Sequence, residues 1–245
     1  MEWRDEGIVI GVRRHGETSA IVEAMTRKHG RHLGLVRGGR STRLQSALQA
    51  GNSLGLVWRA RLDEHLGAYA VEPIALRAGR LIASGLALAG VGYLGALIRL
   101  LPERDPHETL FEALALIADR LDDAGLAPAL IARFEAQVLA ECGFSLDLER
   151  CAATGAREDL IYVSPKSGRA VSAAAGARWK ERLLPLPAFL RLGAMAPAPE
   201  PAEVADAFRL TGFFLTRDVF APRGLPLPDS RRAFLAAAAR AGAGA

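Results

Sequence analysis

Residues 54–62 read LGLVWRARL, a segment in which large apolar side chains alternate with small or charged ones. Successive side chains of a β-strand point to opposite faces of the sheet. A strand here would place Val57, Arg59 and Arg61 on one face and Leu56, Trp58, Ala60 and Leu62 on the other. We therefore expect Trp58 in a hydrophobic core.

Four more segments around this one have strand character. They are EGIVIGV at residues 6–12, SAIVEAMT at 19–26, residues 33–36 and GAYAVE at 67–72, and glycine-containing turns separate most of them. Five short strands within about 75 residues suit a small closed barrel of the OB type, which presents one face to oligonucleotides.

The same region carries charge of one sign. No Asp or Glu occurs between Glu23 and Asp63, where eight cations stand: Arg27, Lys28, Arg31, Arg37, Arg40, Arg43, Arg59 and Arg61. Residues 1–80 hold thirteen Arg or Lys and eight Asp or Glu, a net charge of +5, whereas the remaining 165 residues have a net charge of −1. Most charge runs are ordinary solvated faces. Strands and turns, however, can bring these cations to one surface, where a polyanion would bind.

The tract Arg37-Gly38-Gly39-Arg40-Ser41-Thr42-Arg43 is suited to phosphate binding. Its two glycines let the backbone approach a phosphate closely, and its arginines and hydroxyls supply hydrogen-bond donors. The affinity for single strands would fall as the salt concentration rises, and each phosphate contact would add about 0.7 log unit of affinity per log unit of salt to that fall. Stacking platforms for bases are few: Trp3, Trp58 and Tyr69 are the candidates, and we expect each to be packed.

Length and composition favour a folded protein of two domains. The chain has 245 residues, half of them apolar, and we expect the domains at residues 1–79 and 80–245. Acidic residues in the opening MEWRDEGIVIGV argue against a secretory signal. Two cysteines, Cys142 and Cys151, are too few for a disulfide framework. We expect a cytoplasmic protein.

The second domain begins with an apolar stretch. Eighteen uncharged residues, LIASGLALAGVGYLGALI at 81–98, reach the lower limit for a membrane span. Because glycines, a serine and alanines dilute the stretch, a buried helix is the better interpretation. We expect close backbone packing at its glycines, Gly85, Gly90, Gly92 and Gly95.

The rest of the second domain is predicted as helices with one hairpin, so the fold class is α+β. Asp105 as N-cap, followed by Pro106 and Glu108, predicts a helix that can end at Gly125. Other helices are expected over about 128–141, over about 202–219 and from about residue 230 onward. Within residues 151–178, the stretch IYVSPKSGRAV predicts a hairpin with a Pro-Lys-Ser-Gly turn.

Gly90, Gly92 and Gly95 also spell G-x-G-x-x-G, the fingerprint of dinucleotide-binding folds. In its proper context it would indicate a nicotinamide-dinucleotide-dependent oxidoreductase. That context needs a second strand with an acidic end about 20 residues later, but Ala115 falls inside a predicted helix. The sequence has no G-x-S-x-G, H-E-x-x-H or P-loop motif. We expect no catalytic residue and no cofactor, with the oxidoreductase kept as the alternative.

The opening EGIVIGVRRHGETSAIVEAMTRKHGRHLGLVRGGRSTRLQSALQ resembles the amino-terminal domain of the RecO family of bacterial DNA repair and recombination mediators. The turn at 16–19, the basic loop at 36–43 and the segment at 44–49 stand in the family's order. ARFEAQVLAECGFSLDLERC resembles the family's helix that runs into a zinc-ribbon-like element, and LPLPDSRRAFL resembles its closing helix. The resemblance covers essentially the whole chain.

This resemblance implies an OB-type domain followed by a helical domain. It implies a non-enzymatic, nucleoid-associated protein that binds single- and double-stranded DNA and anneals complementary strands. It also implies cooperation with RecR to help RecA displace single-strand-binding protein.

Arg37, Arg40 and Arg43 match the family's basic loop, and we predict DNA contact for them and for the other five cations of the acid-free stretch. Arg133 stands where the family offers a cation to the acidic tail of single-strand-binding protein. An intrahelical contact with Gln137 explains Arg133 equally well.

Some members of this family hold zinc with two Cys-x-x-Cys pairs. Here Cys151-Ala152-Ala153-Thr154 keeps one ligand of the first pair, and GRAVSAAAG supplies none for the second. One thiolate cannot hold a tetrahedral zinc site. We therefore predict a degenerate, metal-free version of the zinc-ribbon-like hairpin.

Two other classes of function stay open. An RNA-binding OB protein would differ only in the nucleic acid that it chooses. A protein adaptor that binds no nucleic acid would leave the acid-free surface unused.

Overall fold

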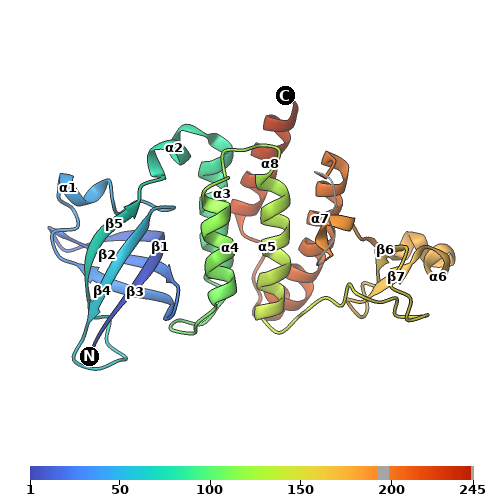
Figure 1. The fold of residues 1–245 in the computed structure, drawn as a ribbon, viewed down its shortest axis with the longest axis horizontal. Helices are drawn as coiled ribbons and strands as arrows, with labels where there is room; N and C mark the ends of the chain where they lie inside the picture. The colour runs from blue at the N-terminus through green and yellow to red at the C-terminus, as the bar shows by residue number, and fades with distance from the viewer. Residues whose placement is uncertain (192–198, 244–245) are drawn as a thin grey trace. The chain divides into compact units, whose positions relative to one another are not determined.

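The structure of this chain is a computed structural model that describes residues 1–191 and 199–243 (Figure 1). Contacts divide the chain into two compact units: Met1–Asp123 with Ser230–Ala241, and Ala124–Asp229 with the residues from Gly242 onward. The first unit thus includes the helices that directly follow the barrel. The division at residue 79 follows the change from strands to helices instead, and it stays a prediction.

Five strands close into a barrel, as expected for the OB type. They are β1 (Glu2–His15), β2 (Ser19–Thr26), β3 (Gly30–Val36), β4 (Ser53–Arg59) and β5 (Ala68–Ala75), in the order β1-β2-β3-β5-β4. All pairs are antiparallel except β3 with β5. The first strand starts earlier than predicted, because its amino-terminal half pairs with β4 and its other half pairs with β2.

The barrel core confirms the alternation of residues 54–62. Trp58 is fully buried and Leu56 is almost so, while Arg59 is exposed. Leu62 departs from the expected pattern, since β4 ends at Arg59 and Leu62 is 45% exposed in the following loop. A short helix, α1 (Thr42–Gln45), lies between β3 and β4.

The apolar stretch at 81–98 forms two helices where one was expected, α2 (Ala78–Ala83) and α3 (Gly85–Ile98). Ser84 between them has an extended backbone, and its hydroxyl accepts a hydrogen bond from the Ala87 amide at 3.2 Å. It is therefore the N-cap of α3. No helix in the described part of the chain is long and apolar enough to cross a membrane.

The glycines of this stretch behave differently from one another. Gly90 is buried, and a Cβ on Gly95 would lie 3.1 Å from the carbonyl oxygen of Ile10 in β1. A Cβ on Gly85 or Gly92 would meet open space. The expectation of close packing is therefore wrong for Gly85 and Gly92.

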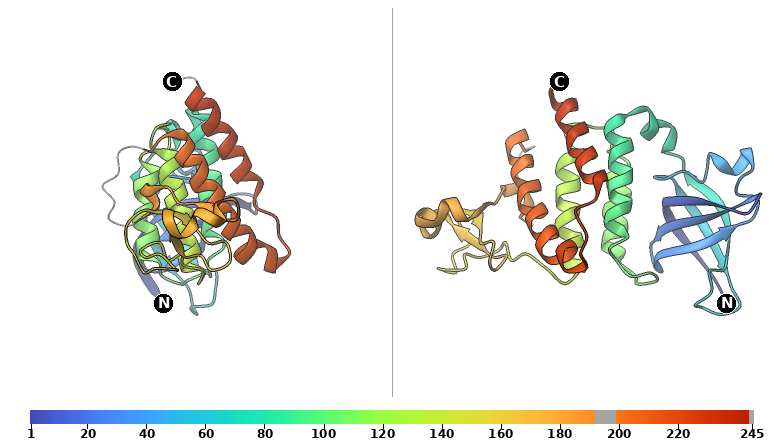
Figure 2. Two further views of the ribbon diagram at one scale, coloured as in Figure 1. Left: turned by 90° about the vertical axis from the view of Figure 1, so that its right-hand side faces the viewer. Right: turned by 180° about the vertical axis from the view of Figure 1, so that it is seen from behind.

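Two further helices complete the first unit. The first is α4 (Glu108–Ala118), whose N-cap is His107 and not the expected Asp105, and which ends before Gly125. The second is α8 (Asp229–Ala243), which begins where the sequence predicted. In Figure 2, α3 stands beside the barrel, in agreement with its contacts to β1.

The second unit contains two packed helices and a small sheet. The helices are α5 (Ala127–Glu141) and α7 (Pro201–Phe214), and the latter continues as η3 (Leu215–Phe220) and η4 (Ala221–Arg223). The sheet has the order β7-β6-β8, from β6 (Leu160–Val163), β7 (Ala170–Ser172) and β8 (Leu184–Pro185). The predicted hairpin is β6 and β7. It is followed by α6 (Ala173–Gly176), η1 (Ala177–Arg182) and, after β8, by η2 (Ala188–Leu190).

Candidate nucleic-acid interface

The loop that follows β3 is tied to the turn between β1 and β2. The backbone amide of Arg40 donates to the Thr18 carbonyl at 3.0 Å. Its guanidinium donates to the carbonyls of Gly16 at 3.2 Å and Glu17 at 2.5 Å. Because these acceptors are uncharged backbone carbonyls, Arg40 fixes the loop and its own positive charge is not neutralised.

The glycine pair makes this attachment possible. Gly38 has φ of +65°, a left-handed conformation that glycine adopts without strain. A Cβ on Gly39 would lie 3.0 Å from both the Ala20 Cβ and the Val36 carbonyl oxygen. The loop therefore lies directly against the barrel.

Arg37 in this loop and Arg43 in α1, which directly follows it, are unengaged cations. Both are exposed, and neither side chain makes a hydrogen bond or ion pair within the described part of the chain. Their charges are therefore available to an anionic ligand.

Arg37 and Arg59 lie on the same groove, which has a volume of about 600 Å³. Its lining comes from the end of β3, the loop and α1, and from β4, the residue that follows it and β5. The remaining lining is largely apolar: Val36, Leu44, Val57, Ala60, Ala68, Tyr69, Ala70 and Val71. A groove with cations at its edges and an apolar floor can hold a phosphate backbone while its bases lie on the floor.

Arg59 already has an anionic partner, Glu2 on the paired strand β1. Its Nε and one terminal nitrogen donate to the two Glu2 oxygens at 2.8 and 3.1 Å. The hydrogen bond from Arg59 lowers the pKa of Glu2, and the same bond raises the pKa of Arg59. Both side chains are exposed, so this pair contributes little to stability and a phosphate can replace Glu2.

Arg27 and Arg31 have structural partners instead. Arg27 pairs with Glu6 at 3.2 Å and with Glu112, and its guanidinium lies 4.5 Å from the centroid of the Phe111 ring. These contacts join the barrel to α4.

Arg31 is held even more closely, with its side chain only 14% exposed. It pairs with Glu23 at 3.0 Å and Glu103 at 3.4 Å, and it donates to the Leu101 carbonyl at 3.3 Å. The structure does not bring Arg27 and Arg31 to the groove.

Lys28 and Arg61 are exposed, and neither lines the groove. Lys28 lies in the turn between β2 and β3, and Arg61 lies beyond the end of β4. Their side chains have no partner among the described residues.

Arg13 and Arg14 are exposed cations that the sequence interpretation passed over. They lie in β1 opposite Ile21 and Ala20 of β2. Arg14 and Arg40 line a second hollow of about 270 Å³ on the other side of the basic loop. The signal was the Arg-Arg pair at the end of the first predicted strand, which lies outside the acid-free stretch.

The aromatic side chains of the barrel are mainly structural. Trp58 and Tyr69 are buried, as expected, and Trp3 is half-buried. The Trp3 ring stacks on His29 at 4.1 Å between centroids. The barrel surface therefore offers charge more than stacking.

Arg133 in α5 borders a separate groove of about 360 Å³ in the second unit. Its Nε donates to the Phe189 carbonyl at 2.8 Å, and its guanidinium lies 5.9 Å from the centroid of the Phe189 ring. The lining also includes Ala136, Ala140, Leu146 and Arg191. Within the described residues no hydrogen bond joins the side chains of Arg133 and Gln137, and both explanations of Arg133 stay open.

The residues around Cys151 do not fit a zinc ion. The buried Sγ of Cys151 accepts a hydrogen bond from the Ser172 amide at 3.3 Å. Burial alone would raise the pKa of this thiol, but hydrogen bonds from Ser172 and Thr154 outweigh it and lower the pKa to about 6. Among the described residues, no group of three or more His, Cys, Asp or Glu side chains could hold a metal.

Gly90, Gly92 and Gly95 all lie inside α3. The dinucleotide fingerprint works at a tight turn between a strand and a helix. The oxidoreductase alternative is therefore wrong in its structural premise.

Comparisons with known proteins match both parts of the chain. A family model described as "Recombination protein O N terminal" matches residues 1–77, and one described as "Recombination protein O C terminal" matches residues 83–225. A DNA repair protein RecO of Methylocella silvestris is 64% identical over 236 residues, which is 96% of this chain and 95% of the relative. The RecO protein of Mesorhizobium japonicum is 60% identical, with 97% of this chain and 93% of the relative covered.

Proposed function

Because this chain belongs to the RecO family of DNA repair proteins, we propose that it is a non-enzymatic recombination mediator that binds DNA through its barrel. It binds single- and double-stranded DNA and anneals complementary strands. It works beside the nucleoid in the cytoplasm.

The observation that carries this proposal is the state of Arg37 and Arg43. Their charges are exposed and unengaged, while Arg40 holds the loop that carries them against the β1–β2 turn. A protein that neutralises phosphates releases counterions from the nucleic acid, which drives binding without regard to sequence. Arg59 and Arg14 extend the same basic surface, and each lines a hollow that borders the loop.

Annealing follows from the same electrostatics. Two complementary strands repel each other through their phosphates, and a basic surface that neutralises both strands lowers that barrier. For this step the protein supplies the positive electrostatic field of its basic surface and no catalytic group.

The proposed partners are RecR, single-strand-binding protein and, indirectly, RecA. The groove beside Arg133 supports the second of these partners. An arginine next to apolar surface suits an acidic peptide that ends in an aromatic residue and a carboxylate. Bound to that tail, the protein would act on DNA that single-strand-binding protein covers and help RecA to load there.

The test compares wild type with an Arg37→Glu/Arg43→Glu variant by fluorescence anisotropy of a labelled single-stranded DNA oligomer. Arg40 is left unchanged because it holds the loop. An Arg120→Glu/Arg223→Glu variant makes the same change in net charge at exposed arginines outside the barrel. We expect tight, salt-sensitive binding by wild type and the control, and weak binding by the loop variant.

Equal binding by all three proteins would place the DNA site elsewhere. No binding by wild type would favour the adaptor. Tighter binding of an RNA oligomer of the same sequence would favour the RNA-binding alternative.

A further inference from the structure

A second basic segment runs through the module that contains the small sheet of the second unit. From Lys166 to Arg191 the sequence has six Lys or Arg and one carboxylate, Glu181. These cations are Lys166, Arg169, Arg178, Lys180, Arg182 and Arg191. This charge bias is nearly as one-sided as in the acid-free stretch of the barrel, which has eight cations and no carboxylate, although the family resemblance points to the barrel alone for DNA.

An exposed tryptophan stands in the middle of this segment. Trp179 in η1 is 55% exposed, whereas Trp58 is fully buried. Residues three apart lie on the same side of a 3₁₀-helix. Arg182 therefore reaches the indole of Trp179, with its guanidinium 5.7 Å from the ring centroid. Trp179 thus offers an open aromatic ring beside a cation, a combination on which a base can stack.

Trp179 is held by ordered structure on both sides. A Cβ on Gly176, just before η1, would lie 2.6 Å from the Tyr162 ring of β6, so the chain packs closely there. After η1, β8 returns to pair with β6, with Leu184 opposite Val163. The exposure of Trp179 is thus a property of the folded module.

Both sequence neighbours of Trp179, and Lys166 in the turn between β6 and β7, have unengaged charges. The side chains of Lys166, Arg178 and Lys180 make no hydrogen bond or ion pair within the described part of the chain. Two others are engaged: Arg169 pairs with Asp147 at 3.1 Å, and Arg191 donates to the Arg157 carbonyl at 3.0 Å.

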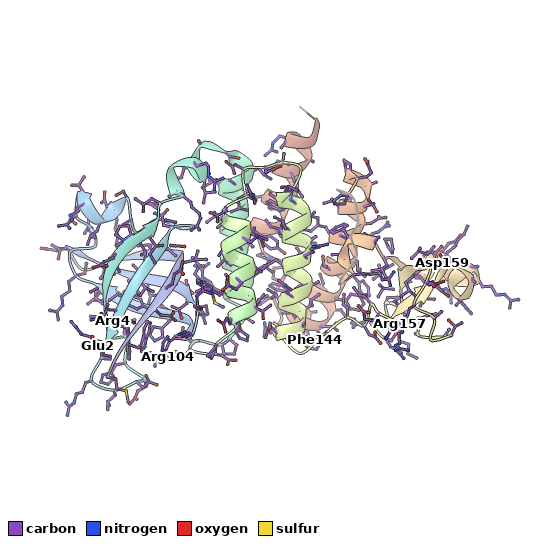
Figure 3. All side chains as sticks on the ribbon, in the orientation of Figure 1. Glu2, Arg4, Arg104, Phe144, Arg157 and Asp159 are labelled. Atoms are coloured by element: carbon purple, nitrogen blue, oxygen red, sulfur yellow. The ribbon has the colours of Figure 1, made fainter. Side chains whose placement is uncertain are left out.

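Acidic residues do border the module. Figure 3 labels Asp159, whose carbonyl accepts a hydrogen bond from the Ala173 amide of α6 at 2.8 Å. Residues 151–191 nevertheless hold seven Lys or Arg and only three Asp or Glu, so cations are in excess.

We propose that Trp179 and its neighbouring cations form a second binding site, for single-stranded DNA, on this module. A base stacks on the indole while Arg178 and Lys180 contact its phosphates. A duplex keeps its bases stacked inside, so it cannot use the indole in this way, and the excess of cations favours a polyanion over a neutral peptide. This site is additional to the barrel surface of the proposed function.

The test is photo-cross-linking of the full-length protein to a thymidine oligomer that contains 5-bromodeoxyuridine, with the adduct mapped by mass spectrometry. We expect an adduct at Trp179 in wild type and also in the Arg37→Glu/Arg43→Glu variant, because the site does not depend on the barrel loop. An adduct confined to other residues overturns the proposal, whatever happens at the barrel.

Affinity supplies the second readout. Removal of an aromatic side chain on which a base stacks lowers the affinity about 5- to 150-fold. We expect that loss for Trp179→Ala in the Arg37→Glu/Arg43→Glu background, with most of the affinity retained by Trp179→Phe. Phe144→Ala is the matched control, since Phe144 is 40% exposed and lies outside the basic segment (Figure 3). If Trp179→Ala in this background cross-links to the oligomer and binds it as well as the Arg37→Glu/Arg43→Glu variant does, the proposal is overturned, and the surface would then suit a protein partner.

Discussion

Inside the barrel, the hydroxyl of Tyr69 lies 2.9 Å from Nδ1 of His32, and both side chains are buried. The rings of Trp3 and Trp58 meet the imidazole edge-on at 5.0 and 5.1 Å. Burial, together with the nearby charge of Arg104, lowers the pKa of His32 to about 4. Burial also raises the pKa of Tyr69. His32 is therefore a neutral core residue at pH 7.

Acid should destabilise the protein through His32. Its pKa falls from 6.5 to about 4 on folding. Below pH 6.5 the unfolded chain takes up a proton that the folded chain refuses, so stability is lost as the pH falls toward 4. We expect the free energy of unfolding to drop by about 2 kcal/mol between pH 7 and pH 5 from this group alone. Urea unfolding at both pH values measures it, and His32→Gln should remove that part of the drop. An equal drop in His32→Gln would assign the effect to other groups.

Gly34 leaves the space that the Tyr69 ring occupies. A Cβ at Gly34 would lie 2.4 to 2.7 Å from three atoms of that ring. Gly34→Ala should therefore lower the free energy of unfolding by about 1–3 kcal/mol, the usual effect of overpacking a core. Gly55→Ala in β4 is the control, because its nearest neighbour would be 3.7 Å away. Thermal melts should separate the two variants, and similar melting temperatures would contradict this packing.

The sequence predicted the elements whose pattern is local. Alternation over 54–62 found β4 and the burial of Trp58, since a strand repeats every two residues. It could not find the break at Ser84, because the residues on both sides of it are equally apolar. The sequence pattern also misplaced the start of α4. Asp is a preferred N-cap residue and His is not, so the pattern favoured Asp105 over the observed N-cap, His107.

The sequence could predict that a basic site exists on the barrel, but not which of the basic residues belong to it. Arg37, Arg40 and Arg43 stand within one stretch of seven residues, so their proximity is local. The roles of Arg27 and Arg31 depend on Glu112 and Glu103, about 70 to 85 residues away in sequence. The cations of an acid-free stretch can therefore still be paired, because the fold brings carboxylates to them from other parts of the sequence.

Chelators should leave this protein unchanged. A structural zinc site contributes directly to folding, and its removal unfolds the domain that it holds. Here one thiolate, Cys151, takes its hydrogen bonds from Ser172 and Thr154. We expect the same melting temperature with and without EDTA, and less than stoichiometric zinc in the purified protein. One zinc per chain by elemental analysis would contradict the metal-free hairpin.

Arg133 should decide the affinity for the tail of single-strand-binding protein. A charge-assisted hydrogen bond to a carboxylate contributes about 1.5–3 kcal/mol, so Arg133→Ala should weaken binding of a labelled tail peptide about 10- to 150-fold. Gln137→Ala changes another residue of the same groove and keeps the charge. Equal peptide affinity in wild type and Arg133→Ala, by anisotropy, would remove the assignment.

Arg31 and Arg43 should separate stability from DNA binding. Arg31→Ala removes two ion pairs and a bond to the Leu101 carbonyl, from a side chain that is 14% exposed. We expect the free energy of unfolding to fall by about 1–3 kcal/mol, with unchanged DNA affinity well below the melting temperature.

Arg43→Ala removes an exposed, unengaged cation, so stability should change by less than about 0.5 kcal/mol. Its DNA affinity should fall, and the salt dependence should lose about 0.7 log unit per log unit of salt. Arg40→Ala should affect both, since Arg40 holds the loop through Gly16 and Glu17. The reverse pattern, with Arg31→Ala weakening DNA binding and Arg43→Ala leaving it unchanged, would move the interface from the loop after β3 to the side of the barrel that faces α4.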